Sequence, residues 1–161
     1  MLDLKDLLLR PPALTLAVAE SMTCGRVQAR LGAISGASQF FLGGITTYTI
    51  DQKVRHLGVD RAQAEADNAV SSAITEQMAI GVCQLFGSSL GVATTGYAEN
   101  PVGRPYPFAW WALAHDLGDG RMAVQSGLID CPGATRTVAQ DAAASAALGA
   151  LVRYLRPLRT A

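Results

Sequence analysis

This sequence has no excess of positive or negative charge. Its 161 residues hold 13 Lys and Arg against 13 Asp and Glu, so the formal net charge is zero. A protein that binds nucleic acid needs an excess of positive charge to neutralise the phosphates. The composition therefore argues against nucleic acid as a partner.

Cysteine and histidine are scarce as well. Cys24, Cys83 and Cys131 cannot all pair, and no CxxC occurs, so the sequence favours reduced thiols in a cytoplasm over a disulfide-stabilised secreted domain. His56 and His115 lie far apart and outside any Cys/His cluster, which argues against a structural zinc site. No local signal supports a Ser-His-Asp triad, although the sequence does not exclude one.

Long apolar runs are missing too. The run Leu7–Leu9, followed by Pro11 and Pro12, is too short for a signal-peptide core or a membrane span. Half of the residues are nevertheless hydrophobic and 16% are charged, which excludes a disordered chain. At about 100–200 residues per domain, this length predicts one domain over residues 1–161.

Glycines and prolines divide the chain into alternating strand-like and helix-like stretches. The predicted strands are Leu14–Val18, Gly44–Ile50, Leu90–Thr95, Phe108–Ala114 and Arg121–Ile129. The predicted helices are Leu2–Leu9, a helix capped within Ser21–Thr23 and running to about Leu31, Asp51–Leu57, a helix capped by Ser71 or Ser72 and ended by Gly87, and Thr135–Leu155, which Arg156-Pro157 should end.

Helices between strands imply parallel crossovers, whereas Gly118-Asp119-Gly120 is typical of a hairpin turn and imposes one antiparallel pair. The predicted fold class is therefore α/β. We expect a three-layer α/β/α sandwich with a mixed, mostly parallel sheet that contains one antiparallel hairpin.

Two motif-like stretches fail in their context. Gly87–Gly91 fits G-x-S-x-G, but a nucleophile elbow needs a strand before the serine and a helix after it, and the predicted order is the opposite. Gly118–Ala123 fits G-x-G-x-x-A, but it lies in the predicted hairpin rather than at the start of a helix. Both stretches are interpreted as turns.

The stretch Ala19–Gly25, AESMTCG, follows a buried strand and opens a helix. The N–H groups of a first helical turn lack intrahelical partners and can bind an anion or a developing oxyanion. Ser21 is therefore a candidate nucleophile, and the alternative is that Ser21 or Thr23 only caps the helix. Cys24 also has two interpretations, a reactive thiol or a small residue packed in place of a glycine.

This stretch, followed in order by ISGASQFFLGGITTYTIDQKVRHLGV, NAVSSAITEQMAIG and VATTGYAENP, resembles the C-terminal domain of the CinA family. That is the domain of the bacterial nicotinamide mononucleotide deamidases. The family pattern is roughly A-E-S-C-T-G-G, Y-S-N-x-x-K, G-A-V-S, then T-G-I-A-G-P and K-P-V-G. The resemblance runs from about Leu14 to Ala114 and identifies the chain as a divergent member.

The resemblance implies hydrolysis of a carboxamide with release of ammonia, by a Ser and a Lys, without a metal or another cofactor. At the matching positions the catalytic residues are Ser21, Lys53 and Tyr48. The substrate-binding residues implied are Glu20, Thr23, Gly25, Thr95, Gly96 and, as a cation that replaces the family's own, Arg104. The partner implied is a small amide such as nicotinamide mononucleotide.

A homo-oligomer is a further expectation from the family. Trp110 and Trp111 alternate along a predicted strand, so that one faces each side of the sheet and could serve a core or an interface. No membrane partner is expected, and the expected location is the cytoplasm.

The chain departs from the family pattern near the expected site. Asn68 replaces the Gly of G-A-V-S, Tyr97 the Ile of T-G-I-A-G-P, and Arg104 the Lys of K-P-V-G. A later family motif, G-D-R-x-x-V-R, loses both arginines, and Arg136 lies one position away. A phosphate needs positive charge or free N–H groups, so we expect weak or absent activity on the mononucleotide unless Arg104 or Arg136 turns into the pocket. The alternative is an inactive family member that binds or interacts.

Overall fold

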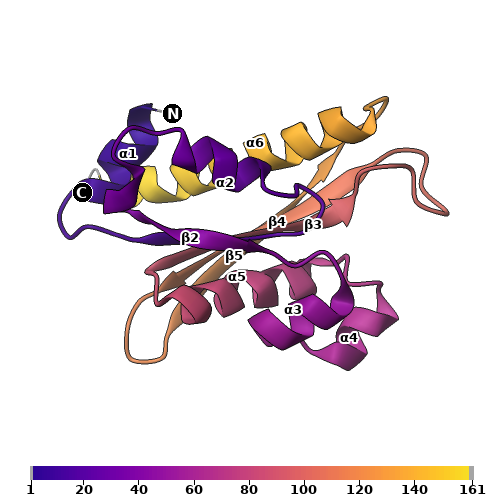
Figure 1. Ribbon diagram of the computed structural model, residues 1–161, viewed down its shortest axis with the longest axis horizontal. Helices are drawn as coiled ribbons and strands as arrows, with labels where there is room; N and C mark the ends of the chain where they lie inside the picture. Colours follow the sequence, from indigo (N-terminus) through magenta and orange to yellow (C-terminus); the bar gives the residue numbers. More distant parts are fainter. Residues whose placement is uncertain (1, 160–161) are drawn as a thin grey trace.

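A five-stranded sheet forms the middle layer of the molecule, with helices on both faces (Figure 1). The computed structural model describes residues 2–159. The strands are β1 (Leu16–Glu20), β2 (Phe41–Thr46), β3 (Leu90–Tyr97), β4 (Phe108–Asp116) and β5 (Met122–Asp130). The three-layer α/β arrangement predicted from the sequence is confirmed.

The sheet is mixed, in the order β2-β1-β3-β4-β5. Strand β1 pairs in parallel with β2 and with β3, and β4 pairs antiparallel with β3 and with β5. The predicted hairpin at Gly118–Gly120 joins β4 to β5 and is confirmed. The antiparallel β3–β4 pair was not predicted. It follows from the loop 98–107, which is shorter than the crossover of about a dozen or more residues that a parallel pair requires.

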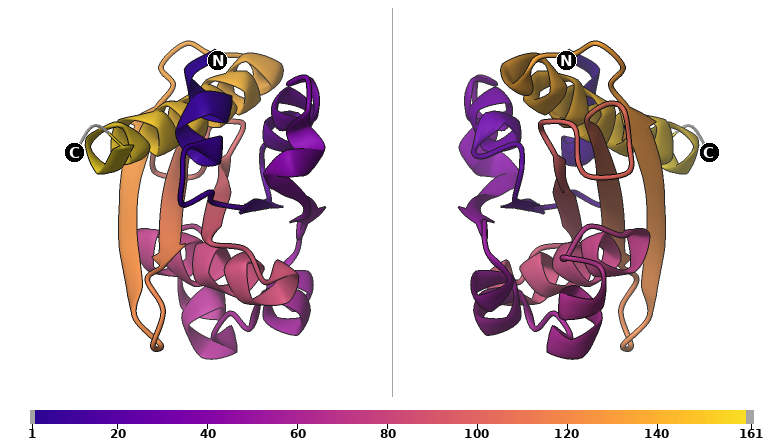
Figure 2. Two further views of the ribbon diagram at one scale, coloured as in Figure 1. Left: turned by 90° about the vertical axis from the view of Figure 1, so that its left-hand side faces the viewer. Right: turned by 90° about the vertical axis from the view of Figure 1, so that its right-hand side faces the viewer.

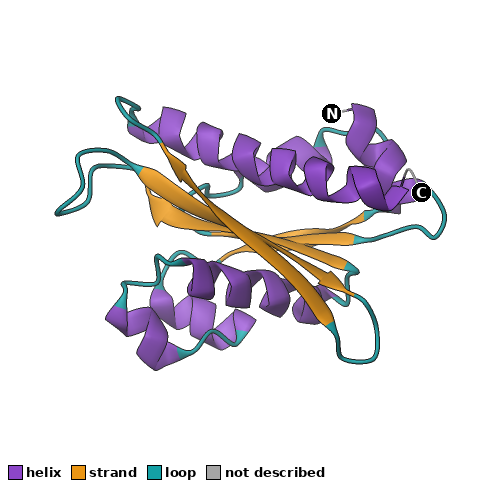
Figure 3. Cartoon of the chain, turned by 180° about the vertical axis from the view of Figure 1, so that it is seen from behind, coloured by secondary structure: helices purple, strands orange, loops and turns teal. Residues whose placement is uncertain are grey.

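Helices cover the sheet in two groups that Figure 3 shows above and below the strands. One face carries α1 (Leu2–Leu9), α2 (Arg26–Gly32) and α6 (Arg136–Arg159), with the short 3-10 helix Ala37–Gln39 beside them. The other face carries α3 (Ile50–Leu57), α4 (Arg61–Ala66) and α5 (Ser72–Phe86). None of the helices described is long and apolar enough to cross a membrane.

The two faces of the sheet are packed differently. Large side chains of β1 such as Leu16 and Val18 point toward α1 and α6, whereas Ala17 and Ala19 face α5. The small side chains let α5 approach the sheet closely. A Cβ added at Gly91 of β3 would lie only 2.1 Å from a backbone oxygen of α5, so this position requires glycine.

Two helix boundaries differ from the predictions. Helix α2 begins only at Arg26, because the residues after β1 form turns instead of a first helical turn. Helix α6 continues past Pro157, which was expected to end it. Proline removes one helical hydrogen bond, but Arg159 in the last turn is buried and donates from Nη2 to the oxygen of Pro12 at 2.9 Å, which anchors the helix end.

Two further differences lie between β1 and α5. Strand β2 occupies Phe41–Thr46 rather than Gly44–Ile50, because Ile50 already belongs to α3. Helix α4 was not predicted, since its sequence RAQAEA has no large apolar residue and only Ala64 is buried. Asp60 caps it by accepting a hydrogen bond from the N–H of Gln63 at 2.7 Å.

Candidate active site

The carboxyl ends of β1, β2 and β3 meet at one edge of the sheet. After β1 the chain turns to α2 on one face, and after the neighbouring β2 it turns to α3 on the other face, as the end views in Figure 2 show. In open α/β sheets, such a divergence leaves a crevice outside the strand ends. A cavity of about 830 Å³ lies here, lined by residues that follow all three strands, and we call it the serine cavity.

Ser21 and Lys53 meet on the wall of the serine cavity. Lys53 lies on α3, and its Nζ is 2.9 Å from Ser21 Oγ and 3.0 Å from the backbone oxygen of Thr47. Only 3% of Lys53 and 6% of Ser21 are exposed. Lysine is rarely buried, and the structure nevertheless buries Lys53 against the serine.

Burial changes the acid–base chemistry of Lys53. Desolvation disfavours the ammonium form, and it lowers the pKa of Lys53 to about 8. No ion pair of Lys53 exists within residues 2–159, so no counter-charge opposes this effect. A lysine with such a pKa has a sizeable neutral fraction near neutral pH and can accept a proton.

Glu20, the last residue of β1, lies behind Ser21 and is fully buried. Its two carboxylate oxygens accept hydrogen bonds at 2.6–3.1 Å from the hydroxyl of Thr23 and from the N–H groups of Gly25, Val27 and Gln28. The carboxylate therefore occupies the N-terminus of α2. The expectation that this helix end holds an oxyanion is wrong for that reason.

Two N–H groups beside the serine stay free. Ser21 N donates to the oxygen of Thr94 at 3.0 Å, and Cys24 N donates to the oxygen of Ser21 at 3.1 Å. Between them, the N–H groups of Met22 and Thr23 have no acceptor in the described part of the chain. Met22 lines the serine cavity, whereas Thr23 is fully buried, so the N–H group of Met22 is the better candidate for contact with an oxyanion.

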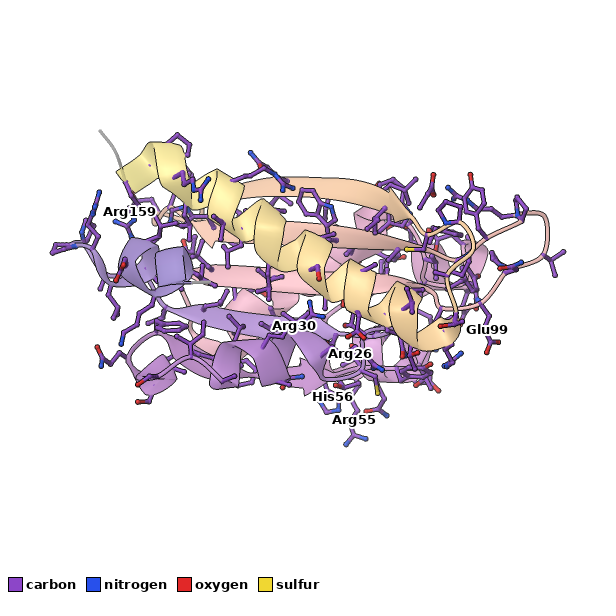
Figure 4. The ribbon with its side chains drawn as sticks, turned by 90° about the horizontal axis from the view of Figure 1, so that it is seen from above. Arg26, Arg30, Arg55, His56, Glu99 and Arg159 are labelled. Carbon is purple, nitrogen blue, oxygen red and sulfur yellow. The ribbon has the colours of Figure 1, made fainter. Side chains whose placement is uncertain are left out.

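Tyr48 follows β2 and is half exposed at the mouth of the cavity. Arg136, the first residue of α6, donates from Nη2 to the Tyr48 hydroxyl at 2.8 Å, and its Nη1 lies 3.4 Å from a carboxylate oxygen of Glu99. Figure 4 shows Glu99 at the end of the molecule where α6 begins, opposite Arg159. Arg136, which lies one position away from the family's arginine in the sequence, thus reaches the cavity wall.

The end of β3 supplies the opposite wall. Thr95 and Gly96 both line the cavity, and the Thr95 hydroxyl donates to the backbone oxygen of Ala69 at 2.9 Å. A Cβ at Gly96 would lie 2.4 Å from the oxygen of Phe108, so the close approach of β4 requires glycine there. Glycine at this position follows from sheet packing as well as from the family pattern.

Other expected residues lie elsewhere. Glu20, Thr23 and Gly25 support the serine from behind and are not on the cavity wall. Arg104 is also outside it, in an ion pair with Asp130.

The two histidines and Cys24 are not on the wall of the serine cavity either. Exposed His56 contacts Gln52, and Figure 4 shows it on the outer surface with Arg55. His115 pairs with Leu90 in the sheet register, at the start of β3 and far from Thr95. Cys24 is exposed with a φ of 48°. Within residues 2–159, no group of three or more His, Cys, Asp or Glu is placed to hold a metal.

The fold and this site together define an α/β protein with a buried serine–lysine pair at the carboxyl ends of its parallel strands. The family model of the CinA C-terminal domain matches residues 4–155. The chain belongs to this family.

Known relatives agree with the assignment. A CinA-like protein of Chlorobium limicola is 36% identical over 156 residues, which cover 92% of this chain and 36% of that protein. The chain thus spans well under half the length of the curated relatives it matches. A CinA superfamily structure from Klebsiella pneumoniae is 25% identical, covers 96% of this chain and 94% of its own, and has a TM-score of 0.83. The competence/damage-inducible protein CihA of Agrobacterium tumefaciens is 27% identical, with a TM-score of 0.82 and 96% of both chains covered.

Proposed function

We propose that this chain is an amide hydrolase of the nicotinamide mononucleotide deamidase type, in which Ser21 is the nucleophile and Lys53 its base. The observation that carries the proposal is the 2.9 Å contact between a buried lysine Nζ and a serine Oγ on the wall of the serine cavity. A serine hydroxyl is a weak nucleophile and needs a neighbouring base. Lys53 fits that role because its pKa is lowered to about 8.

The contacts of Lys53 explain how it acts as a base. Neutral Lys53 keeps two N–H donors and one lone pair. One N–H remains on the oxygen of Thr47, 3.0 Å away, and the lone pair then accepts the hydroxyl proton of Ser21. The contact with Thr47 fixes the direction of the lone pair toward the serine.

The reaction follows from this arrangement. Ser21 Oγ attacks the carboxamide carbon and gives its proton to Lys53 Nζ. The N–H group of Met22 stabilises the negative oxygen that develops. Collapse breaks the C–N bond, and the proton on Lys53 leaves with the nitrogen as ammonia. Water then attacks the ester, gives one proton to Lys53, and that proton returns to Ser21 as the carboxylic acid leaves.

Arg136 and Tyr48 suit the remainder of the substrate. A bound phosphate gains from a guanidinium, and Arg136 offers one at the cavity mouth, where exposed Glu99 is its present ion-pair partner. The family's arginines are missing, which led us to expect weak activity on the mononucleotide, but Arg136 offers a cation for the phosphate. Tyr48, hydrogen-bonded to Arg136 at 2.8 Å, orients that guanidinium.

Ammonia release from purified protein tests the proposal. Wild type is incubated with nicotinamide mononucleotide and with nicotinamide riboside, which lacks the phosphate. Ser21→Ala should remove the activity and Lys53→Met should lower it by about 10²–10⁴-fold, whereas Lys5→Met, at the chain's other lysine on α1, should retain it. Absence of ammonia from every amide offered would favour the alternative of an inactive binding domain.

A further inference from the structure

A second cavity of about 600 Å³ adjoins the serine cavity, and we call it the loop cavity. Asn68, Tyr97 and Asn100 line both cavities, so the two share a wall. The loop between β3 and β4 forms much of the second one, and Figures 1 and 3 show this loop extending past the end of the sheet. A substrate that fills the serine cavity can therefore continue directly into the loop cavity.

Planar side chains dominate the loop cavity. The rings of Tyr97 and Phe108 lie with their centroids 5.5 Å apart. The guanidinium of Arg104 lies 4.0 Å from the centroid of the Phe108 ring and 5.3 Å from that of Tyr106, and it forms an ion pair with Asp130. Aromatic rings and arginine planes are the surfaces on which nucleobases stack.

Polar groups beside these planes can contact the edge of a bound ring. Asn68 Nδ2 donates to the hydroxyl oxygen of Tyr97 at 2.8 Å, which leaves the phenolic hydrogen free to donate to a ligand. Asn68 and Tyr97 both depart from the family pattern, and the structure joins them to each other. Arg104 departs from it as well, replacing a lysine with a planar cation.

We infer that the loop cavity is a subsite for a second planar heteroaromatic ring on the same substrate. The substrate class is then a carboxamide joined through phosphates to a purine, which is a pyridine dinucleotide rather than a mononucleotide. The inference rests on the proposed function, which places the carboxamide at Ser21. Arg136, on the wall of the serine cavity, supplies a cation for the linking phosphates.

Calorimetric titration with adenosine monophosphate tests the subsite without hydrolysis, because this probe has no carboxamide. Ribose 5-phosphate, which has the phosphate but no base, is the matched ligand. A stacked base contributes about 5- to 150-fold in affinity. Adenosine monophosphate should therefore bind at least about 5-fold more tightly than ribose 5-phosphate.

Two substitutions locate the probe. Arg104→Lys keeps the positive charge beside Asp130 but loses the planar group, and Tyr97→Ile removes the ring. Each should lower the affinity for adenosine monophosphate about 5-fold or more. Arg153→Lys, on the exposed surface of α6, should leave that affinity unchanged. If Tyr97→Ile does not fold, Tyr97→Phe tests the hydroxyl contact with Asn68. This variant should lower the affinity for adenosine monophosphate by a smaller factor.

The outcomes separate the two proposals. No saturable binding up to about 10 mM, equal affinity for the two ligands, or binding that Arg104→Lys and the Tyr97 variants leave unchanged would overturn the subsite. Probe binding by a protein that releases no ammonia would support the subsite and refute the amide hydrolase. Deamidation by a protein that does not bind the probe would refute the subsite alone.

Discussion

The pH dependence of amide hydrolysis should reflect the pKa of the buried Lys53. With a pKa of about 8, Lys53 is about 9% neutral at pH 7 and about 90% neutral at pH 9. At the ordinary lysine value of 10.5 the neutral fraction at pH 7 would be roughly 300-fold smaller. Almost all of the neutral Lys53 present at pH 7 is therefore due to the lowering of its pKa by burial.

We expect kcat/KM for ammonia release to rise about 10-fold per pH unit below pH 8 and to level off above it. Lys53→Met should lower the plateau by about 10²–10⁴-fold, the usual contribution of a general base. Lys53→Arg should do the same, because a guanidinium does not release its proton in this range. Lys5→Met should leave both the plateau and the apparent pKa unchanged.

A profile that is flat from pH 6 to 9, or one that Lys53→Met does not alter, would refute this reasoning. A second measurement is independent of activity. Because the pKa of Lys53 is lowered on folding, the contribution of Lys53 to the free energy of unfolding should rise with pH between 8 and 10.5. Burial raises the pKa of Cys83 to about 11, and this thiol opposes the rise above pH 9, so the contribution of Lys53 is measured as the difference between wild type and Lys53→Met. The gain is on the order of 3 kcal/mol, and Lys53→Met should remove it.

Three other substitutions test the surroundings of the pair. Arg136→Ala should raise KM for a phosphorylated amide about 10- to 100-fold in steady-state assays, the loss of one charged hydrogen bond, and leave KM for nicotinamide riboside unaltered. Glu20→Gln puts an amide N–H₂ against N–H donors and should lower the free energy of unfolding by about 1–3 kcal/mol in urea titrations. Ser21→Ala should abolish ammonia release, and activity that survives it but is lost in a further Cys24→Ser change would assign the nucleophile to the thiol.

Local signals in the sequence predict most of the fold. The helix at Ser72–Phe86 and the hairpin at Gly118–Gly120 both carry clear periodicity and turn residues, and both are present. The antiparallel return from β3 and the small helix α4 have no such signal. Their form depends on loop length and on contacts across the sheet rather than on residues within the element.

The site could be predicted only partly. The residues of β1 and the turn after it mark Ser21, but the contact with Lys53 spans 32 positions and depends on how α3 packs after β2. Only the family resemblance singled out Lys53 in advance. Arg136 was one of two candidates to replace the missing cations, and the start of α6 decides between them by placing Arg136 at the cavity and leaving Arg104 with Asp130.

Glu20 and Lys53 show why burial alone does not assign a role. Both are almost completely buried; Glu20 directly precedes Ser21 in the chain, and Lys53 contacts its hydroxyl. Glu20 accepts four hydrogen bonds, so its charge is satisfied and its effect is to hold the turn that presents the serine. Lys53 contacts only the carbonyl of Thr47 and the hydroxyl of Ser21 and has no carboxylate partner in the described residues, so burial disfavours its ammonium form. A buried charge that is fully paired serves structure, whereas one that is left short of partners is the group prepared to give up its proton.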